Sequence, residues 1–257
     1  MAINDTRFKR IPWIFFDLDD TIWNFSANSA LALRRLYEIS PILRKLFKSI
    51  DEFIDIYHEH NAKMWLLYSR GEVTTAQLKI ERWRRTLATR QFEVLTAVCE
   101  ELDRNYLDIL ARCETKFENI DTLLQSLSRH ALLAVLSNGF LTTQYNKLRY
   151  SGLDRYITRM IVSEEIGINK PDKRLFDYAI AETGATPPYL YIGDNGETDI
   201  LGALKAGWHA IWVNPSGSPL PMTKEQMEEN GIDPQLLLAE VKEIKDVESV
   251  IFKFLDF

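Results

Sequence analysis

The chain has 257 residues, 46% of them hydrophobic, which is enough to bury one large core or two modest ones. Its formal net charge of −6 argues against binding of a nucleic-acid polymer through a general basic field. The sequence contains no run near the ~18 apolar residues of a membrane span and no apolar signal segment in residues 1–7, so we expect a cytoplasmic protein with no membrane partner.

The first predicted element is a short buried strand, Ile14–Phe16, which ends at a cluster of acids. Asp17, Asp19 and Asp20 occupy three of the four positions after it, and Thr21 follows. Carboxylates this close cannot all stay ionised unless a cation or a proton lies among them. The pattern therefore indicates a metal site or a catalytic site at the carboxyl end of the strand.

Residues 24–114 have a helical pattern and are predicted to form a small bundle, a cap domain inserted after the first strand. Thr74 and Gln77 match a capping box that starts a helix after Gly71. The basic run 82–85 is interpreted as a solvated helix face. Cys99 and Cys113, in one predicted helix, would lie roughly 21 Å apart, too far for a disulfide. Two apolar stripes support the bundle: Phe53, Ile56, Tyr57, Met64, Trp65 and Tyr68, and Phe92, Leu95, Cys99, Leu102, Tyr106, Ile109 and Cys113.

From about residue 119 strands and helices alternate, which predicts an α/β fold with a doubly wound parallel sheet. Residues 1–23 and 115–257 would form this Rossmann-like core. The predicted strands are Leu132–Leu136, Arg159–Val162, Tyr189–Ile192, Ala210–Val213 and Glu240–Ile244. The predicted helices are Leu141–Tyr150, Lys173–Thr183, Asp199–Ala206, Thr223–Glu229 and Asp246–Leu255.

Polar clusters follow several of these strands, on the side where open α/β sheets bind ligands. They are the acids after Phe16, the run Ser137-Asn138-Gly139, the dipeptide Lys170-Pro171, and Gly193-Asp194 with Asp199 five residues further on. Each of the last three has an ordinary alternative: a turn, a solvated lysine before a helix that has Pro171 in its first turn, and a helix cap made by Asp199. Their joint occurrence in this order favours one functional site.

This motif set resembles the haloacid dehalogenase superfamily of aspartate-nucleophile phosphohydrolases. The chain is similar, more closely, to the branch that contains bacterial pyrimidine 5′-nucleotidases. That closer resemblance rests on Asn138-Gly139-Phe140, Gln144, Leu148, Gly152-Leu153, the run 163–167, the run 170–173 and the run 198–203, together with Asn61, Trp65, Tyr68, Gly71-Glu72 and Thr74 in the cap.

The resemblance implies a role for each residue of the core motifs. Asp17 would be the nucleophile that forms an aspartyl phosphate, and Asp19 the proton donor and later the base; Asp20 is interpreted as structural. Ser137, the backbone amides of Asn138 and Gly139, and Lys170 would bind the phosphate. Mg²⁺ would be held by the Asp17 and Asp194 carboxylates, the Asp19 backbone carbonyl, and Asp199 directly or through water.

We therefore expect a Mg²⁺-dependent hydrolase of small phosphomonoesters, with nucleoside 5′-monophosphates as the preferred substrates. Asn61 and Trp65 are the predicted substrate contacts in the cap, with Tyr68, Phe140 and Gln144 as further candidates. Trp65 and Tyr68 have bundle packing as their alternative role. A sugar-phosphate phosphatase, a phosphomutase, a haloacid dehalogenase and a non-catalytic phosphate-binding module stay open, as does the oligomeric state.

Overall fold

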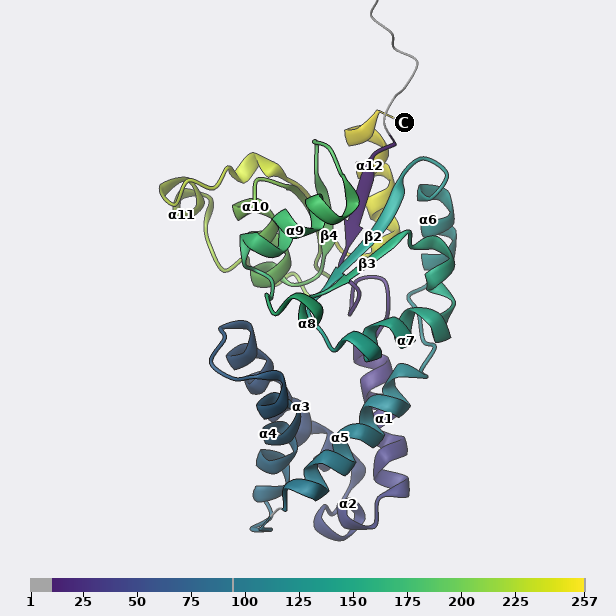
Figure 1. The fold of residues 1–257 in the computed structure, drawn as a ribbon, viewed down its shortest axis with the longest axis vertical. Coiled ribbons are helices and arrows are strands. Elements are labelled where there is room, and N and C mark those ends of the chain that lie inside the picture. The colour runs from purple at the N-terminus through teal and green to yellow at the C-terminus, as the bar shows by residue number, and fades with distance from the viewer. Residues whose placement is uncertain (1–10, 94, 257) are drawn as a thin grey trace, which may run out of the picture. The chain divides into compact units, whose positions relative to one another are not determined.

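The computed structural model describes residues 11–93 and 95–256, and packing divides the chain into two compact units (Figure 1). The sheet unit contains the residues up to Ile22, Phe117–Ser137, and those from Leu153 onward. The helical unit contains Trp23–Lys116 and Asn138–Gly152. A partition by packing does not identify independently folding domains, so the predicted boundaries near 24 and 115 stay a prediction. The expectation about a signal segment concerns residues 1–7, which lie outside the described residues.

The sheet unit is built on six parallel strands in the order β3-β2-β1-β4-β5-β6, which confirms the predicted α/β class. The strands are β1 (Trp13–Phe16), β2 (Leu132–Ser137), β3 (Arg159–Val162), β4 (Leu190–Gly193), β5 (His209–Val213) and β6 (Leu237–Val241). The chain builds outward from β1 to β3 and then returns to the other side of β1 with β4. Phe16 lies opposite Val135 of β2 and Ile192 of β4, so the carboxyl ends of these three strands lie together at this reversal.

Helices cover both faces of the sheet (Figure 1). On one side lie α9 (Lys173–Thr183) and α10 (Gly202–Lys205), and on the other α6 (Ile120–Leu127) and α12 (Val247–Leu255). The remaining short elements are η1 (Leu153–Tyr156), α8 (Ser163–Ile166), the π-helical turn η2 (Gly196–Leu201), α11 (Lys224–Glu229), η3 (Pro234–Leu236) and η4 (Ile244–Asp246).

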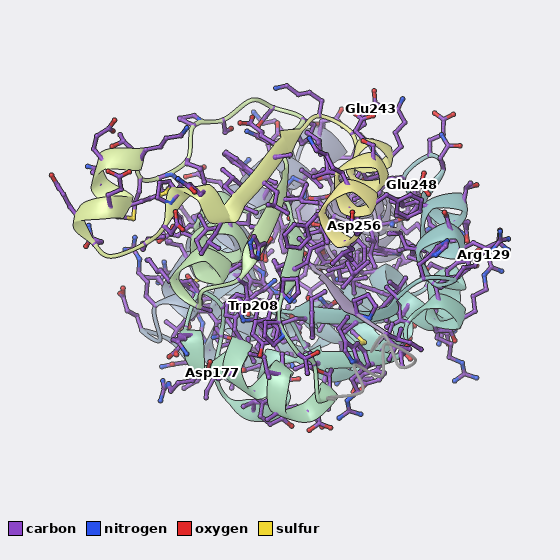
Figure 2. All side chains as sticks on the ribbon, turned by 90° about the horizontal axis from the view of Figure 1, so that it is seen from above. Arg129, Asp177, Trp208, Glu243, Glu248 and Asp256 are labelled. Atoms are coloured by element: carbon purple, nitrogen blue, oxygen red, sulfur yellow. The ribbon has the colours of Figure 1, made fainter. Side chains whose placement is uncertain are left out.

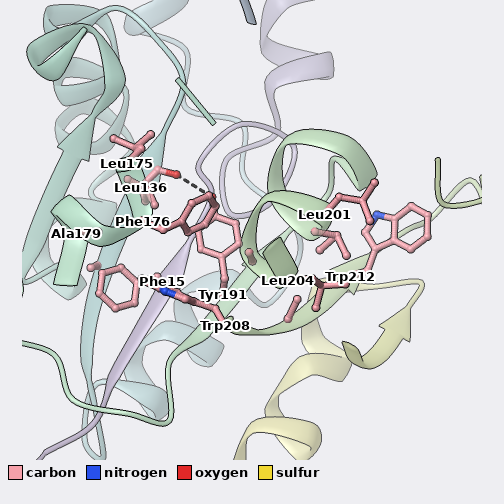
Figure 3. Close-up of a cluster of buried hydrophobic side chains, with 14 of the residues drawn as sticks. Phe15, Leu136, Leu175, Phe176, Ala179, Tyr191, Leu201, Leu204, Trp208 and Trp212 are labelled. Carbon is pink, nitrogen blue, oxygen red and sulfur yellow. Dashed lines mark hydrogen bonds between the residues drawn. The ribbon is translucent and has the colours of Figure 1, made fainter. Parts of the chain in front are cut away.

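Several aromatic side chains lie in the core beneath α9 and α10 (Figure 3). The ring of Trp208 lies 4.8 Å from that of Phe15 and 5.4 Å from that of Phe176, measured between centroids. Trp208 is fully buried, whereas charged side chains such as Arg129 and Asp177 are exposed (Figure 2). Because alternate residues of a strand face opposite sides, Phe15 joins this core while Ile14 and Phe16 are buried on the other face.

The helical unit packs five helices that follow β1 with one helix that follows β2. They are α1 (Phe25–Ile39), α2 (Pro41–Leu46), α3 (Ile50–Ser69), α4 (Thr75–Ala88), α5 (Thr96–Ala111) and α7 (Leu141–Ser151). The predicted capping box at Thr74 and Gln77 opens α4. Cys99 and Cys113 are buried free thiols. Among the described residues no helix has the length and apolar character needed to cross a lipid bilayer.

Several predicted element boundaries were wrong. The last strand, predicted at Glu240–Ile244, is β6 at Leu237–Val241, an edge strand with a register shift against β5. The helix predicted from Asp199 begins three residues earlier, as the π-helical turn. Pro171 lies before the N-cap residue of α9, Asp172, and so outside the first turn of that helix.

Two predictions about side-chain burial in the helical unit were also wrong. Arg82 and Trp83, assigned to a solvated face, are 2% and 0% exposed because Arg82 pairs with the buried carboxylate of Asp103. Phe92 and Leu95, assigned to an apolar stripe, are exposed because α5 begins only at Thr96.

Candidate active site

The carboxyl edge of the sheet brings together side chains that lie far apart in the sequence. Asp17 directly follows β1, Ser137 is the last residue of β2, and Asp194 directly follows β4. The Asp17 amide donates a hydrogen bond of 2.8 Å to the carbonyl of Ile192 in β4, which fixes its backbone next to that strand. Ligands of open α/β sheets bind where the strand order reverses, and that reversal lies between β1 and β4.

Lys170 reaches this edge from the loop before α9 and is 1% exposed. Its Nζ donates to Asp17 Oδ1 at 2.5 Å, to Asp199 Oδ1 at 2.7 Å and to the hydroxyl of Tyr191 at 2.7 Å. Although burial alone would lower the pKa of Lys170, the charges of Asp17 and Asp199 raise it above its ordinary value. The side chain is therefore a buried ammonium that joins two carboxylates.

Asp199 is held by the turn that carries it. The side chain of Asn195 caps η2 by accepting from the amides of Glu197 and Thr198, and the Asn195 amide donates to Asp199 Oδ2 at 3.0 Å. The other carboxylate oxygen accepts from Lys170. Only glycine fits at position 193 beside the carboxylate of Asp199, since a Cβ on Gly193 would lie 2.5 Å from Asp199 Oδ2. Asp199 is thus a fixed partner of Lys170.

The carboxylates of this edge outnumber the positive charges near them. Asp17, Asp194 and Asp199 with Lys170 carry an excess of two negative charges when all four are ionised. Burial, followed by the charges of Asp199 and Asp17, raises the pKa of Asp194 to about 9. Burial is also the main cause that raises the pKa of Asp17 to about 7, against the opposing effect of Lys170. The cluster therefore favours a bound proton or a bound cation.

The same cluster supplies the oxygen ligands that a hard divalent cation prefers. One carboxylate oxygen from each of Asp17, Asp194 and Asp199 lies within 4.8 Å of the other two. Mg²⁺ binds oxygen ligands in an octahedron and keeps several waters, so few protein carboxylates suffice. Because both oxygens of Asp199 accept hydrogen bonds within the protein, Asp17 and Asp194 are the carboxylates best suited to direct contact. The residues present fit Mg²⁺.

The remaining acids of the first cluster occupy a tight turn. Asp20 has a φ of 57°, in the left-handed region that aspartate tolerates better than most residues. The turn directs the buried hydroxyl of Thr21 to Asp194 Oδ1, at 3.3 Å. Asp19 is half-buried within the same segment. Its backbone carbonyl as a metal ligand and its carboxyl as a proton donor stay predictions.

The segment predicted to bind phosphate, Ser137-Asn138-Gly139, begins at the end of β2. Ser137 is 1% exposed at the end of β2, whereas Asn138 and Gly139 group by packing with the helical unit. A Cβ on Gly139 would lie 2.6 Å from atoms of the Gln144 side chain, so the segment turns tightly against the start of α7. Phosphate binding by these three residues stays a prediction.

The predicted substrate contacts of the cap have different surroundings. Asn61 is 8% exposed, and its Oδ1 accepts a hydrogen bond of 3.1 Å from Arg82. Trp65 is half-buried, with its ring 5.4 Å from that of Phe140 and 5.6 Å from that of Tyr68. Asn61 thus belongs to a buried polar network, whereas Trp65 keeps part of its indole accessible.

Sequence reasoning missed Tyr191, Thr21 and Asp103. Tyr191 interrupts an apolar strand with a hydroxyl, and a buried tyrosine hydroxyl usually has a hydrogen-bond partner, which was the available signal. Thr21 was noted only as a hydroxyl after the acids. Nothing in the local sequence marks Asp103 as the partner of Arg82, 21 residues away.

Comparisons with known proteins agree with this geometry. A model of the haloacid dehalogenase-like hydrolase family matches residues 11–207. Pyrimidine 5′-nucleotidase YjjG of Escherichia coli K12 is 30% identical over 207 residues, covering 79% of this chain and 85% of that protein. Glyceraldehyde 3-phosphate phosphatase of Methanothermobacter thermautotrophicus is 27% identical over 237 residues, covering 90% and 98%. A crystal structure of YfnB from Bacillus subtilis bound to magnesium superposes with a TM-score of 0.77 at 26% identity, covering 97% and 100%.

The family model spans all four motifs, from the strand before Asp17 to the helix after Asp199. The name of the relative YjjG, a pyrimidine 5′-nucleotidase, agrees with the branch resemblance inferred from the sequence. The chain therefore belongs to the haloacid dehalogenase-like hydrolase family.

Proposed function

We propose that this hydrolase removes phosphate from small phosphomonoesters, with Mg²⁺ bound and through an aspartyl phosphate on Asp17. The observation that carries the proposal is the cluster of Asp17, Asp194, Asp199 and Lys170, whose two excess negative charges in the ionised state match a divalent cation. When bound, Mg²⁺ would screen the anionic phosphate from the anionic nucleophile. A dehalogenase needs no such cation, which favours phosphate chemistry for this cluster.

The residues divide the reaction into two displacements. A carboxylate oxygen of Asp17 attacks phosphorus, the bond from phosphorus to the ester oxygen breaks, and that oxygen takes a proton from Asp19. Asp19 then removes a proton from water, whose oxygen attacks phosphorus and releases phosphate and the Asp17 carboxylate. Ser137 donates its hydroxyl to a phosphate oxygen. Lys170 offsets the charge that collects on the transferring phosphoryl group.

Nucleoside 5′-monophosphates are the substrates we propose first. The relative from Escherichia coli is named a pyrimidine 5′-nucleotidase, at 30% identity. In the helical unit, the partly exposed indole of Trp65 packs against Phe140 and offers an aromatic face on which a base could stack. Small sugar phosphates are the second class, because the methanogen relative is named for glyceraldehyde 3-phosphate.

A phosphate-release panel tests both parts of the proposal. The wild type is incubated with p-nitrophenyl phosphate, nucleoside 5′-monophosphates and sugar phosphates, with Mg²⁺ or with EDTA. We expect release only with Mg²⁺ and fastest from a nucleotide. Asp17→Asn should lower kcat by at least about a thousandfold because the nucleophile is lost. The matched control, Asp177→Asn, removes one exposed carboxylate of α9 and should keep full activity.

Each contrary outcome identifies a different function. Faster release from sugar phosphates than from every nucleotide would refute the nucleotidase and keep the phosphatase. Halide release from a 2-haloacid without metal would indicate a dehalogenase, and migration of the phosphate within the substrate a phosphomutase. Absence of turnover on the whole panel, with phosphate still bound, would indicate a binding module.

A further inference from the structure

Tyr191 is a fully buried residue of β4 whose hydroxyl has two polar contacts, and Figure 3 shows the one with Leu136. Its ring packs against Phe176, with centroids 5.6 Å apart and planes at 73°. The hydroxyl donates to the backbone carbonyl of Leu136 at 2.8 Å and accepts from Lys170 Nζ at 2.7 Å. Because Leu136 directly precedes Ser137, the hydroxyl links the Lys170 ammonium to the end of β2.

The contact between Tyr191 and Lys170 matters because of the other acceptors that Lys170 has. An ammonium has three N–H donors, and Asp17, Asp199 and Tyr191 are among the acceptors of Lys170. Phosphoryl transfer to Asp17 converts its carboxylate to an acyl phosphate, and the displaced ester oxygen carries the displaced charge away and takes the proton of Asp19. The negative charge that remains next to Lys170 at this position is then that of the phosphoryl oxygens. Asp199 and Tyr191 are chemically unchanged by this step. The hydrogen bonds from Lys170 to Asp199 and Tyr191 can therefore persist through the step. The N–H group that faced Asp17 can turn toward the phosphoryl oxygens.

We infer that Tyr191 is a positioning residue for the reaction: its hydroxyl and Asp199 hold the Lys170 ammonium so that its third N–H stays aimed at the transferring phosphoryl group. The inference rests on the proposed function. A neutral acceptor suits the role, since a third carboxylate would offset more of the positive charge that the phosphoryl group needs. The carbonyl of Leu136 orients the hydroxyl, because the proton donated to it leaves an oxygen lone pair for Lys170.

Tyr191→Phe tests the inference because it keeps the ring and removes only the hydroxyl. Because a hydrogen bond to a charged group is stronger than one between neutral groups, we expect kcat to fall at least about tenfold. KM should change by less than about twofold, since the contact acts on charge that develops during transfer. The inhibition constant of orthovanadate, which adopts the five-coordinate geometry of phosphoryl transfer, should rise at least about tenfold for the same reason.

The vanadate measurement separates positioning from simple loss of folded enzyme. A smaller folded fraction lowers the maximal rate but leaves an inhibition constant unchanged. The matched control is Tyr106→Phe, which removes another buried hydroxyl, 2.8 Å from Ser29 Oγ in the helical unit, and should leave the vanadate constant unchanged. An active wild type with unchanged kcat and vanadate constant in Tyr191→Phe would overturn the inference alone. A wild type without phosphatase activity would overturn the proposed function and the inference with it.

Discussion

Mg²⁺ affinity should depend steeply on pH, because the metal and protons compete for the same carboxylates. Without metal, the pKa of Asp17 is raised to about 7 and that of Asp194 to about 9, chiefly by burial. Metal binding to ionised carboxylates must therefore displace two protons below pH ~7 and one between pH ~7 and ~9. We expect the dissociation constant of Mg²⁺ to fall about 100-fold per pH unit in the first range and about tenfold per unit in the second.

Isothermal titration calorimetry in pairs of buffers with different ionisation enthalpies measures both the affinity and the protons released. Asp194→Asn should bind Mg²⁺ more weakly and lose the proton released between pH ~7 and ~9. The control Asp177→Asn has the same change in charge at an exposed position and should follow the wild type. A wild-type affinity that is constant from pH 6 to 8, or binding without proton release, would refute this account of the cluster.

The raised pKa values of Asp17 and Asp194 also determine how the free energy of unfolding changes with pH. Both carboxyls have a raised pKa in the folded state, above the ordinary value of 3.8, so the folded state without metal binds more protons than the unfolded chain. Their contribution to the free energy of unfolding is fully present below pH ~4 and is lost as the pH rises through about 7 and then about 9. Thermal unfolding should therefore show an increase in Tm on Mg²⁺ addition that grows with pH, and an increase that shrinks would contradict the assignment.

Two further predictions concern the packing around buried charges. Asp103→Asn leaves the Arg82 guanidinium buried without its counter-ion and should cost about 3–5 kcal/mol in urea unfolding, whereas Asp108→Asn, at an exposed position of the same helix, should cost less than about 1 kcal/mol. A small cost at Asp103 would refute a structural role for the pair. Gly193→Ala places a Cβ 2.5 Å from Asp199 Oδ2 and should weaken Mg²⁺ binding and phosphate release together; wild-type values for both would show that the site adapts.

The sheet and its polar edge were predictable because each signal is local in the sequence. Continuous apolar runs mark buried parallel strands, and the polar residues that end them, such as Asp17, Ser137 and Asp194, mark one edge. The last strand was misplaced for the converse reason. β6 is an edge strand whose residues are mostly half-buried, so no continuous apolar run sets its limits.

Pairings between distant residues could not be predicted in the same way. The basic run at 82–85 has the composition of a solvated face, and only the packing of α4 against α5 brings Arg82 to Asp103 and buries both. Tyr191 similarly depends on a lysine that lies 21 residues before it and reaches the sheet from a loop. A local sequence pattern shows which residues are polar. Whether a polar residue is buried depends on its partner, which can lie far away in the sequence.

Charge balance separates two buried cations of this protein, Arg82 and Lys170, by role. In the helical unit, Arg82 faces one carboxylate, Asp103, whose Oδ1 also accepts from the indole of Trp83, while Asn61 accepts from the guanidinium. The ion pair in that network is neutral without a ligand, which is what a structural pair requires. In the sheet unit, Lys170 lies among three carboxylates, which leave two negative charges in excess when all four groups are ionised. A buried excess of charge is costly to maintain, so its retention at a strand reversal is best explained by a cation and a reaction that use it. Burial alone would not have distinguished the structural network around Arg82 from the candidate active site around Lys170.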